Sequence, residues 1–232
     1  MRGQVTNAFD ARKYMVRGAV RMSKLKVIVV GAGIIGAASA FELASLGADV
    51  LMLDGGDARA TEGSFGWINA SFFENSEYHA LRVEGIAAYH RLQKRLDVPV
   101  RWTGGLCWEF AGDAFDVQFE ALLSEGYNSE TLDRAAIAAL EPALGVVPER
   151  AIRFAAEGVA EPAAIAERFL EAAIALGAKV ARGFHVQGFL QNAGQICGVR
   201  TEQGVFEADR VLVAAGTGTK ALLKDVGIAL PM

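Results

Sequence analysis

The feature that most constrains the fold is a glycine-rich turn between a short apolar run and an Ala-rich segment. Val27 to Val30 is β-branched and predicts a buried strand, and residues 31–36 follow it with the spacing G-x-G-x-x-G. The segment from Ile34 to Leu46 predicts a helix that ends at Gly47, and residues 49–53 form a second apolar run. Together these segments predict a right-handed βαβ unit in a parallel sheet buried on both faces.

Each glycine of the turn has its own physical role. Gly31 permits the sharp turn, Gly33 lets backbone N–H groups approach a pyrophosphate, and Gly36 lets the helix pack closely on the strand. Asp54 ends the second strand, 18 residues after Gly36, where its carboxylate can accept hydrogen bonds from ribose hydroxyls. The strand, turn, helix and acidic residue therefore predict dinucleotide binding. NAD and FAD share this first unit, so the motif alone does not choose between them.

Helical patterns recur along the rest of the chain, and each ends at a glycine or before a proline. Pro162 stands where a helix begins, and Gly177 stands where that helix stops. Apolar residues at helical spacing predict four further helices, at residues 81–96, 115–123, 132–140 and 162–176.

Strand patterns dominate the last third of the chain. Short apolar runs at Val180 and at residues 184–190, 196–201 and 205–208 are separated by turn residues and are typical of a β-meander. Residues 210–214 predict a parallel-type strand whose small-residue end, Ala215-Gly216, can admit a cofactor close to the backbone.

Two segments between the helices have less regular patterns. Residues 100–110 alternate apolar and polar side chains, which predicts a strand pair or one bent strand. Residues 60–73 mix glycine, serine and aromatic residues, and we expect a loop or the start of a short helix there.

Composition excludes several classes of partner. The 232 residues are 52% apolar and carry a net charge of −4 without basic clusters, which argues against nucleic acid. The longest uncharged run, Val27 to Phe41, is shorter than the ~20 residues that span a bilayer. The two cysteines, Cys107 and Cys197, have no metal-type spacing, and we expect them to be buried free thiols with no metal site.

The first residues lack the apolar core of a secretory signal. Residues 1–22 are basic, and Met22 opens the regular part of the chain. We therefore expect a disordered extension, or a start codon placed too early, in a protein that is cytoplasmic or peripheral to the inner face of a membrane.

Five segments, in order, resemble the D-amino acid oxidase-like FAD-dependent oxidoreductases, which include glycine and sarcosine oxidases and D-amino acid dehydrogenases. The first segment is shared widely, whereas the order of all five is more specific. The resemblance covers nearly all of residues 26–232 and rests on residues 31–54, 61–72, 140–144, 157–180 and 204–223.

The resemblance implies an α/β fold: a Rossmann-like FAD-binding domain with a parallel sheet and a β-meander, plus part of a substrate domain. On this basis residues 23–98 form the first part of the FAD-binding domain. Residues 99–150 belong to the partial substrate domain, and residues 151–232 form the second part of the FAD-binding domain. We expect the chain to stop at the crossover to a further substrate region.

The resemblance also implies that FAD is the cofactor and indicates which residues contact it. The expected contacts run from the pyrophosphate at the glycine turn to the ribose, the flavin ring and the adenine. In chain order they are Gly31, Gly33, Ile34, Ile35, Gly36, Asp54, Thr61, Ser64, Phe65, Gly66, Val186, Ala215 and Gly216. Val186 would contact the adenine through its backbone.

The activity that the resemblance implies is oxidation of the C–N bond of a small amine or amino acid. In such enzymes Arg and Tyr residues of the later half hold the substrate carboxylate, and the catalytic residues here stay unassigned. We expect no turnover from this chain alone. The alternative is a non-catalytic remnant or subunit that binds a dinucleotide and acts beside a partner chain or in a homo-oligomer. An NAD-dependent dehydrogenase is disfavoured by the late Ala-x-Gly strand.

A few other residues invite a functional interpretation without a supporting pattern. His79 and His90 lie 11 residues apart on one expected helix, but packing or surface roles are favoured because no third metal ligand is evident. His185 is expected to be structural. Trp67 either covers the flavin or packs in the core.

Overall fold

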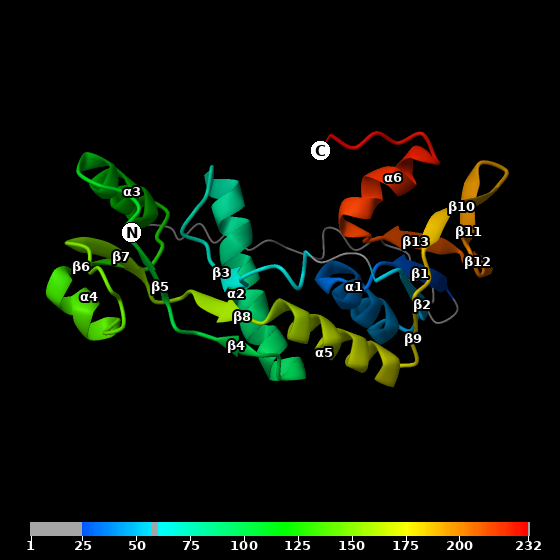
Figure 1. The fold of residues 1–232 in the computed structure, drawn as a ribbon, viewed down its shortest axis with the longest axis horizontal. Helices are drawn as coiled ribbons and strands as arrows, with labels where there is room; N and C mark the ends of the chain where they lie inside the picture. The colour runs from blue at the N-terminus through cyan, green and yellow to red at the C-terminus, as the bar shows by residue number, and fades with distance from the viewer. Residues whose placement is uncertain (1–24, 57–59, 232) are drawn as a thin grey trace, which may run out of the picture.

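A computed structural model describes residues 25–56 and 60–231, and the extension predicted at residues 1–22 lies outside them. Figure 1 shows a long molecule with a parallel sheet towards one end and small antiparallel sheets towards the other. Helix α2 (Ser76–Leu96) stands between these two regions.

The parallel sheet contains four strands in the order β13-β1-β2-β9. All neighbouring pairs are parallel, and α1 (Ile34–Ser45) connects β1 to β2, which confirms the predicted βαβ unit. The strands are β1 (Lys26–Val30), β2 (Asp49–Asp54), β9 (Lys179–Arg182) and β13 (Arg210–Val213). The assignment of Val180 to the meander was wrong: β9 pairs with β2, because α5 (Pro162–Ala175) returns the chain to the sheet edge as a parallel crossover.

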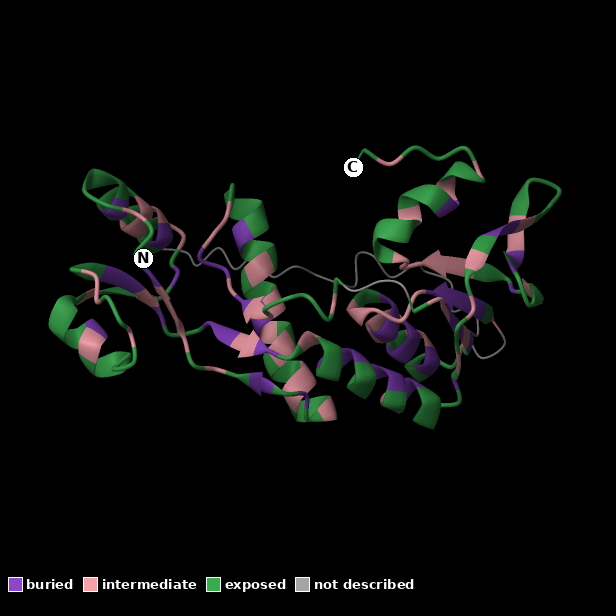
Figure 2. Cartoon of the chain, viewed as in Figure 1, coloured by how far each residue is buried: buried purple, intermediate pink, exposed green. Residues whose placement is uncertain are grey.

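Both faces of the parallel sheet are covered, as the apolar runs predict. Val27 and Val29 of β1 join the core formed with α1 and α5, whereas Ile28 and Val30 join the core on the opposite side. Successive side chains of a strand point to opposite faces, so one continuous apolar run can serve both layers. Figure 2 shows the buried residues of α1 and α5 along the length of both helices.

The opposite face carries an antiparallel meander and a short helix. The meander order β10-β11-β12 confirms the three later strand predictions. These elements are β10 (Val186–Asn192), β11 (Gln195–Thr201), β12 (Gly204–Glu207) and α6 (Thr219–Lys224). Ala193 and Gly194 both have positive φ, which is the geometry of the tight primed hairpin turn between β10 and β11.

Two three-stranded antiparallel sheets form the other region, in the orders β3-β8-β4 and β5-β7-β6. The strands are β3 (Trp67–Ile68), β4 (Val100–Arg101), β5 (Gly105–Cys107), β6 (Ser129–Asp133), β7 (Arg150–Phe154) and β8 (Gly158–Ala160). Helices α3 (Asp113–Ser124) and α4 (Arg134–Leu140) lie beside them in Figure 1.

Several local expectations in this region need correction. Residues 100–110 do not pair with themselves: β4 pairs with β8 and β5 pairs with β7, in separate sheets. The segment expected as a loop at 60–73 contains the strand β3. The helix predicted from residue 132 begins at Arg134, because Asp133 ends β6 and its side chain caps α4 by accepting the N–H of Ala136 at 2.8 Å.

Sheet pairing extends the second region beyond the segment 99–150. Strands β7 and β8 pair with β4, β5 and β6 from that segment, and β8 also pairs with β3. Strands as far as Ala160 therefore pair with strands of that segment or with β3, and the domain boundaries stay a prediction.

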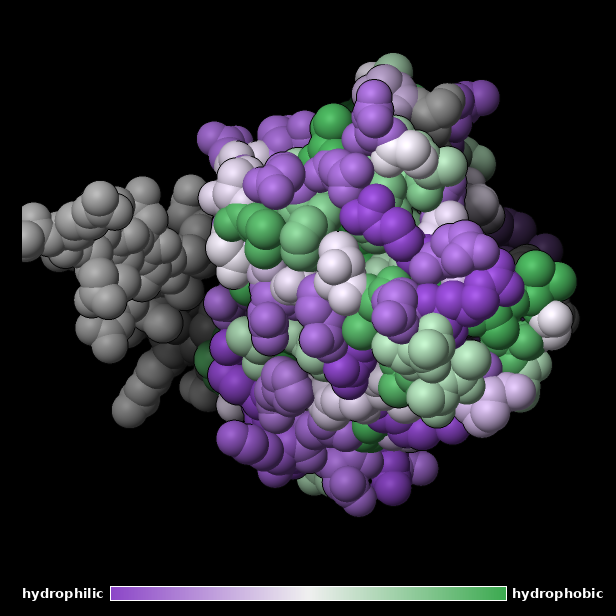
Figure 3. All heavy atoms as spheres, turned by 90° about the vertical axis from the view of Figure 1, so that its left-hand side faces the viewer, coloured by the Kyte–Doolittle hydropathy of each residue, from purple (hydrophilic) through white to green (hydrophobic). Residues whose placement is uncertain are grey.

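The surface of the second region is largely hydrophilic. Figure 3 faces the end that carries α3 and α4 and shows hydrophobic side chains in small groups among hydrophilic ones. No helix within residues 25–56 and 60–231 combines the length and apolar character needed to cross a membrane.

Candidate cofactor site

The glycine turn joins β1 to α1 through two contacts that exclude side chains. Gly31 has φ +100°, and a Cβ there would overlap the carbonyl oxygen of Ala214 at the end of β13. A Cβ on Gly36 would overlap the carbonyl oxygen of Gly31. The turn can therefore form only with glycine at these two positions.

Gly33 differs from the other two glycines because its open side faces a cavity. A Cβ on Gly33 would meet only the hydroxyl of Thr61, at 3.1 Å. The residue is the N-cap of α1 and has an extended backbone. Gly33 itself therefore adds no side chain between the backbone N–H groups of the helix N-terminus and the cavity, which suits an anion.

Gly31 lines two cavities. The large cavity has a volume of about 740 Å³ and lies between the N-terminus of α1 and helix α2. The small cavity has a volume of about 500 Å³ and lies at the ends of β1 and β2, beside the start of β10. The turn is thus the point where an extended ligand could pass from one cavity to the other.

The two cavities divide most of the predicted cofactor residues between them. Asp54, Val186 and Ala215 line the small cavity. The large cavity is lined by Gly33, Ile34, Ile35, Thr61, Ser64, Gly66 and Gly216. Segments far apart in the sequence therefore meet around one turn.

Two predicted residues do not line either cavity. Gly36 is buried against the turn, where its role is packing. Phe65 is 79% exposed. Their contact with a cofactor stays a prediction.

Two backbone N–H groups at the turn donate hydrogen bonds to side-chain oxygens. Asp54 Oδ1 accepts the N–H of Ala32 at 3.0 Å, and Thr61 Oγ1 accepts the N–H of Ile34 at 3.0 Å. No donor to Asp54 Oδ2 is present among the described residues, so this oxygen is available to a ribose hydroxyl. These residues fit a dinucleotide: the remaining N–H groups of the first turn of α1 lie next to a carboxylate that has a free acceptor oxygen.

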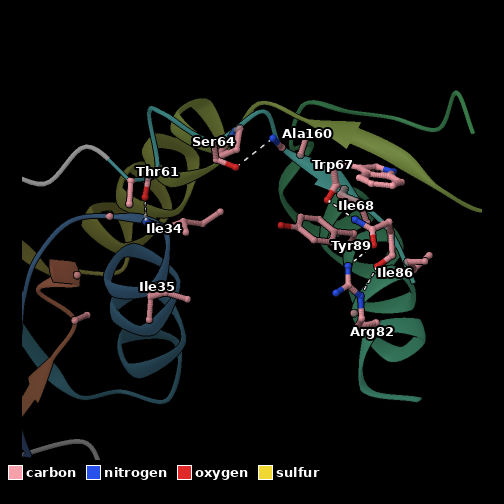
Figure 4. Close-up of a pocket in the computed structure, with 18 of the residues that line it drawn as sticks. Ile34, Ile35, Thr61, Ser64, Trp67, Ile68, Arg82, Ile86, Tyr89 and Ala160 are labelled. Atoms are coloured by element: carbon pink, nitrogen blue, oxygen red, sulfur yellow. Dashed lines mark hydrogen bonds between the residues drawn. The ribbon is translucent and has the colours of Figure 1, made fainter. Parts of the chain in front are cut away.

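Sequence reasoning missed the α2 side of the large cavity. Arg82, Tyr78 and Tyr89 of α2 line this wall together with Asn69. Figure 4 shows Arg82 and Tyr89 across the cavity from Ile34 and Ile35. Burial raises the pKa of Tyr89 above its ordinary value, so its phenol stays protonated at neutral pH. Only the packing of α2 shows which of its residues face the cavity.

The fully buried carboxylate of Glu157 accepts hydrogen bonds from the segment that contains Trp67 and Asn69, two residues of this wall. Its Oε2 accepts the indole N–H of Trp67 at 2.9 Å, and its Oε1 accepts the N–H groups of Ala70 and Ser71, each at 3.0 Å. The hydroxyl of Tyr127 donates to Oε1 at 3.1 Å. Four donors on one buried carboxylate fix the chain on both sides of Asn69.

Trp67 and the histidines have identifiable neighbours. Trp67 lines the large cavity, and its indole N–H donates to Glu157.

His79 is buried between Phe73 and Tyr127, and its Nδ1 lies 3.0 Å from the carbonyl oxygen of Ala70. The ring of His90 stacks on Trp102 at 3.8 Å. His185 lines the small cavity. Within the described part of the chain, no three metal-binding side chains gather in one place.

A comparison with protein families decides the family of the chain. The family model described as FAD dependent oxidoreductase (DAO) matches residues 26–232. The chain belongs to this family. The match starts at β1 and includes the glycine turn, both cavities and the second region.

Individual proteins are similar to this chain over most of its length. The glycine oxidase of Pseudomonas putida is 31% identical over 226 residues, which cover 91% of this chain and 60% of that protein. The structure of glycine oxidase from Geobacillus kaustophilus has a TM-score of 0.80 at 23% identity, covering 89% of this chain and 59% of that one. Iminodiacetate oxidase from Chelativorans sp. BNC1 has a TM-score of 0.81 at 23% identity, covering 88% and 59%. At this identity the structures establish the fold. The chain spans about three fifths of the length of these relatives.

Proposed function

We propose that this chain binds FAD in an extended form across the glycine turn and provides the FAD-binding part of an oxidoreductase. The adenosine end would lie in the small cavity, near Asp54 and Val186. The pyrophosphate would lie at Gly33 and the N-terminus of α1, and the flavin end would lie in the large cavity. The reaction would be oxidation of the C–N bond of an amine or amino acid, as the names of the similar proteins suggest.

One observation supports this proposal: Gly31 lines both cavities, and each cavity is also lined by residues that the resemblance assigns to a different part of FAD. A mononucleotide would need only one of the cavities. The large cavity is bounded by apolar side chains such as Ile34 and Ile35 and by the aromatic rings of Trp67 and Tyr89, which suits a planar ring system.

FAD, when bound, supplies the electron acceptor for the oxidation, and the residues of the chain position and shield the reacting groups. The N-terminus of α1 would offset the charge of the pyrophosphate through its dipole and its free N–H groups. Thr61 holds the N–H of Ile34 and so limits movement of the first turn of α1. Glu157 holds Trp67 and the chain around Asn69 at the wall of the large cavity.

The first prediction is that the purified chain binds FAD in preference to NAD. Equilibrium dialysis with FAD, followed by competition with increasing NAD, measures this directly. We expect saturable binding of one FAD per chain. A hundredfold excess of NAD should not displace it, which means that the binding free energies of FAD and NAD differ by at least about 2.7 kcal/mol. Displacement of FAD by a comparable concentration of NAD would contradict the proposal.

A further inference from the structure

The hydroxyl of Tyr89 is a polar group at the α2 wall of the large cavity that the proposed function leaves unused. Figure 4 shows the Tyr89 ring directed into the cavity, towards the side that carries Ile34 and Ile35. None of the residues in the ranges 25–56 and 60–231 forms a hydrogen bond with this hydroxyl. It is therefore free to bond to a ligand in the cavity.

The other tyrosines of the described part of the chain use their hydroxyl groups within the protein. The hydroxyl of Tyr78 accepts an N–H of Arg82 at 2.8 Å, and that of Tyr127 donates to Glu157 at 3.1 Å. Tyr89 is half-buried, and burial raises the pKa of its phenol, which therefore stays a donor at neutral pH. A donor that is partly removed from water and has no protein acceptor favours an acceptor on a ligand.

The position of Tyr89 on α2 places it opposite the first turn of α1. The large cavity and a groove of about 630 Å³ between α1, α2 and α5 share four lining residues, Ile34, Ile35, Gly85 and Tyr89. Arg82 lines the large cavity but not this groove, because it lies seven residues nearer the start of α2, or roughly 10 Å along the helix axis. Among the polar side chains that α2 contributes to the cavity, Tyr89 is thus the one beside the first turn of α1, where the pyrophosphate is expected.

Building on the proposed function, we propose that the Tyr89 hydroxyl donates a hydrogen bond to a phosphate oxygen of the FAD pyrophosphate. The N–H groups of the first turn of α1 would contact the pyrophosphate from one side of the cavity, and Tyr89 would contact it from the other. A hydrogen bond to a charged acceptor is stronger than one between neutral groups, so a single phenol contributes measurably to the affinity. Because α1 covers the parallel sheet and α2 stands between the two regions, the bound pyrophosphate would link α1 to α2 across the cavity.

The test measures the affinity of the full chain for two ligands, FAD and ADP, by equilibrium dialysis. ADP carries the diphosphate and the adenosine without the flavin, so it separates the pyrophosphate contact from any contact with the flavin end. The variant Tyr89→Phe removes the hydroxyl and keeps the ring. Arg91→Gln is the matched control, because Arg91 lies on the same helix, pairs with Glu84 at the surface and does not line the large cavity. Urea denaturation without ligand measures the stability of each protein.

We expect Tyr89→Phe to bind both FAD and ADP at least about tenfold more weakly than the unchanged chain does, which is the effect of losing one hydrogen bond to a charged group. Without ligand, its free energy of unfolding should equal that of the unchanged chain, because the hydroxyl has no partner in the described part of the protein. Arg91→Gln should bind both ligands as tightly as the unchanged chain.

Three results would overturn the inference. The first is an unchanged affinity of Tyr89→Phe for either ligand; if only FAD binding weakens, Tyr89 contacts the flavin end instead. The second is a Tyr89→Phe chain that does not fold, which would show that the hydroxyl serves the fold. The third is the absence of saturable ADP binding to the unchanged chain. Failure of the unchanged chain to bind FAD is a separate result, and it overturns the proposed function itself.

Discussion

Asp54 combines a structural and an expected ligand-binding role in one carboxylate. The sequence indicates the role at the ribose, from the position of the acid at the end of β2. The structure adds a bond that the sequence does not show, from the N–H of Ala32 to Oδ1 at 3.0 Å. This bond could not be predicted because it depends on the path of the turn after Gly31.

The second prediction separates these two roles of Asp54. Asp54→Ala removes both, and loss of hydrogen bonds to a charged group costs about 1.5–3 kcal/mol, so FAD should bind roughly ten- to hundredfold more weakly. Asp54→Asn keeps an oxygen for Ala32 but loses the negative charge, and we expect a smaller loss of affinity. Flavin fluorescence titration measures both dissociation constants. An unchanged constant in Asp54→Ala would show that the residue does not bind the ribose.

Tyr127 gives the third prediction, which concerns pH. Burial above all, and then the neighbouring Glu157 carboxylate, raise the pKa of Tyr127 well above its ordinary value near 10. The folded state therefore holds the phenol proton more tightly than the unfolded state does. This contribution to stability is complete below about pH 10 and is lost progressively as the pH rises above that value towards the folded-state pKa.

Urea denaturation of the unchanged chain and of Tyr127→Phe at several pH values tests this. At neutral pH the variant should lose about 1 kcal/mol of unfolding free energy, from the missing hydrogen bond to Glu157. Above about pH 10 the difference between the two proteins should shrink, because only the unchanged chain must deprotonate Tyr127. A difference that stays constant through the alkaline range would contradict the assignment.

At the scale of elements, long periodic segments were predictable and short strands were not. Helices α1, α2 and α5 follow from apolar spacing with a glycine or proline at their ends, and β1 and β2 follow from apolar runs buried on both faces. Strands β3 and β8 contain two and three residues, which is too short for a periodic pattern. Their pairing depends on long-range contacts that no local pattern encodes.

Gly66 shows how such a pairing constrains the sequence. Gly66 has φ +67°, and a Cβ on it would overlap the carbonyl oxygen of Ala160. The two residues are also joined by a hydrogen bond, in which the N–H of Ala160 donates to the carbonyl oxygen of Gly66 at 2.8 Å. The resemblance implies that Gly66 lies near the cofactor, which stays a prediction, and Gly66 lines the large cavity. The structure provides a second reason for glycine at this position, because the backbone at Gly66 closely approaches the backbone at Ala160.

The fourth prediction compares Gly66→Ala with Gly85→Ala. The first should lower the free energy of unfolding by more than about 1 kcal/mol, because alanine is strained at positive φ and overlaps the β8 backbone. The second lies inside α2 with nothing within 4 Å of the added methyl group, and should raise stability by about 0.5–1 kcal/mol. Thermal unfolding followed by circular dichroism measures both. Equal effects of the two substitutions would contradict the geometry at β3 and β8.

At the scale of the whole molecule, the candidate site lies where the two regions face each other. The glycine turn and the small cavity belong to the parallel-sheet region, and their residues could be predicted because the backbone chemistry of the turn has a recognisable spacing. The opposite wall of the large cavity comes from α2 and β3. Arg82 and Asn69 were not predictable, since their meeting depends on how α2 packs against the chain after β3.

The central claim is that FAD crosses the turn at Gly33, and an added side chain at this position tests it most directly. Gly33→Val places methyl groups where the pyrophosphate must approach the backbone, whereas Gly145→Val adds the same group at a position with nothing within 4 Å. FAD titrations of both variants by equilibrium dialysis, with folding checked by circular dichroism, give the result. We predict that Gly33→Val weakens FAD binding by at least about a hundredfold, or about 2.7 kcal/mol, and that Gly145→Val leaves it unchanged. A folded Gly33→Val chain that binds FAD as tightly as the Gly145→Val chain would contradict the account.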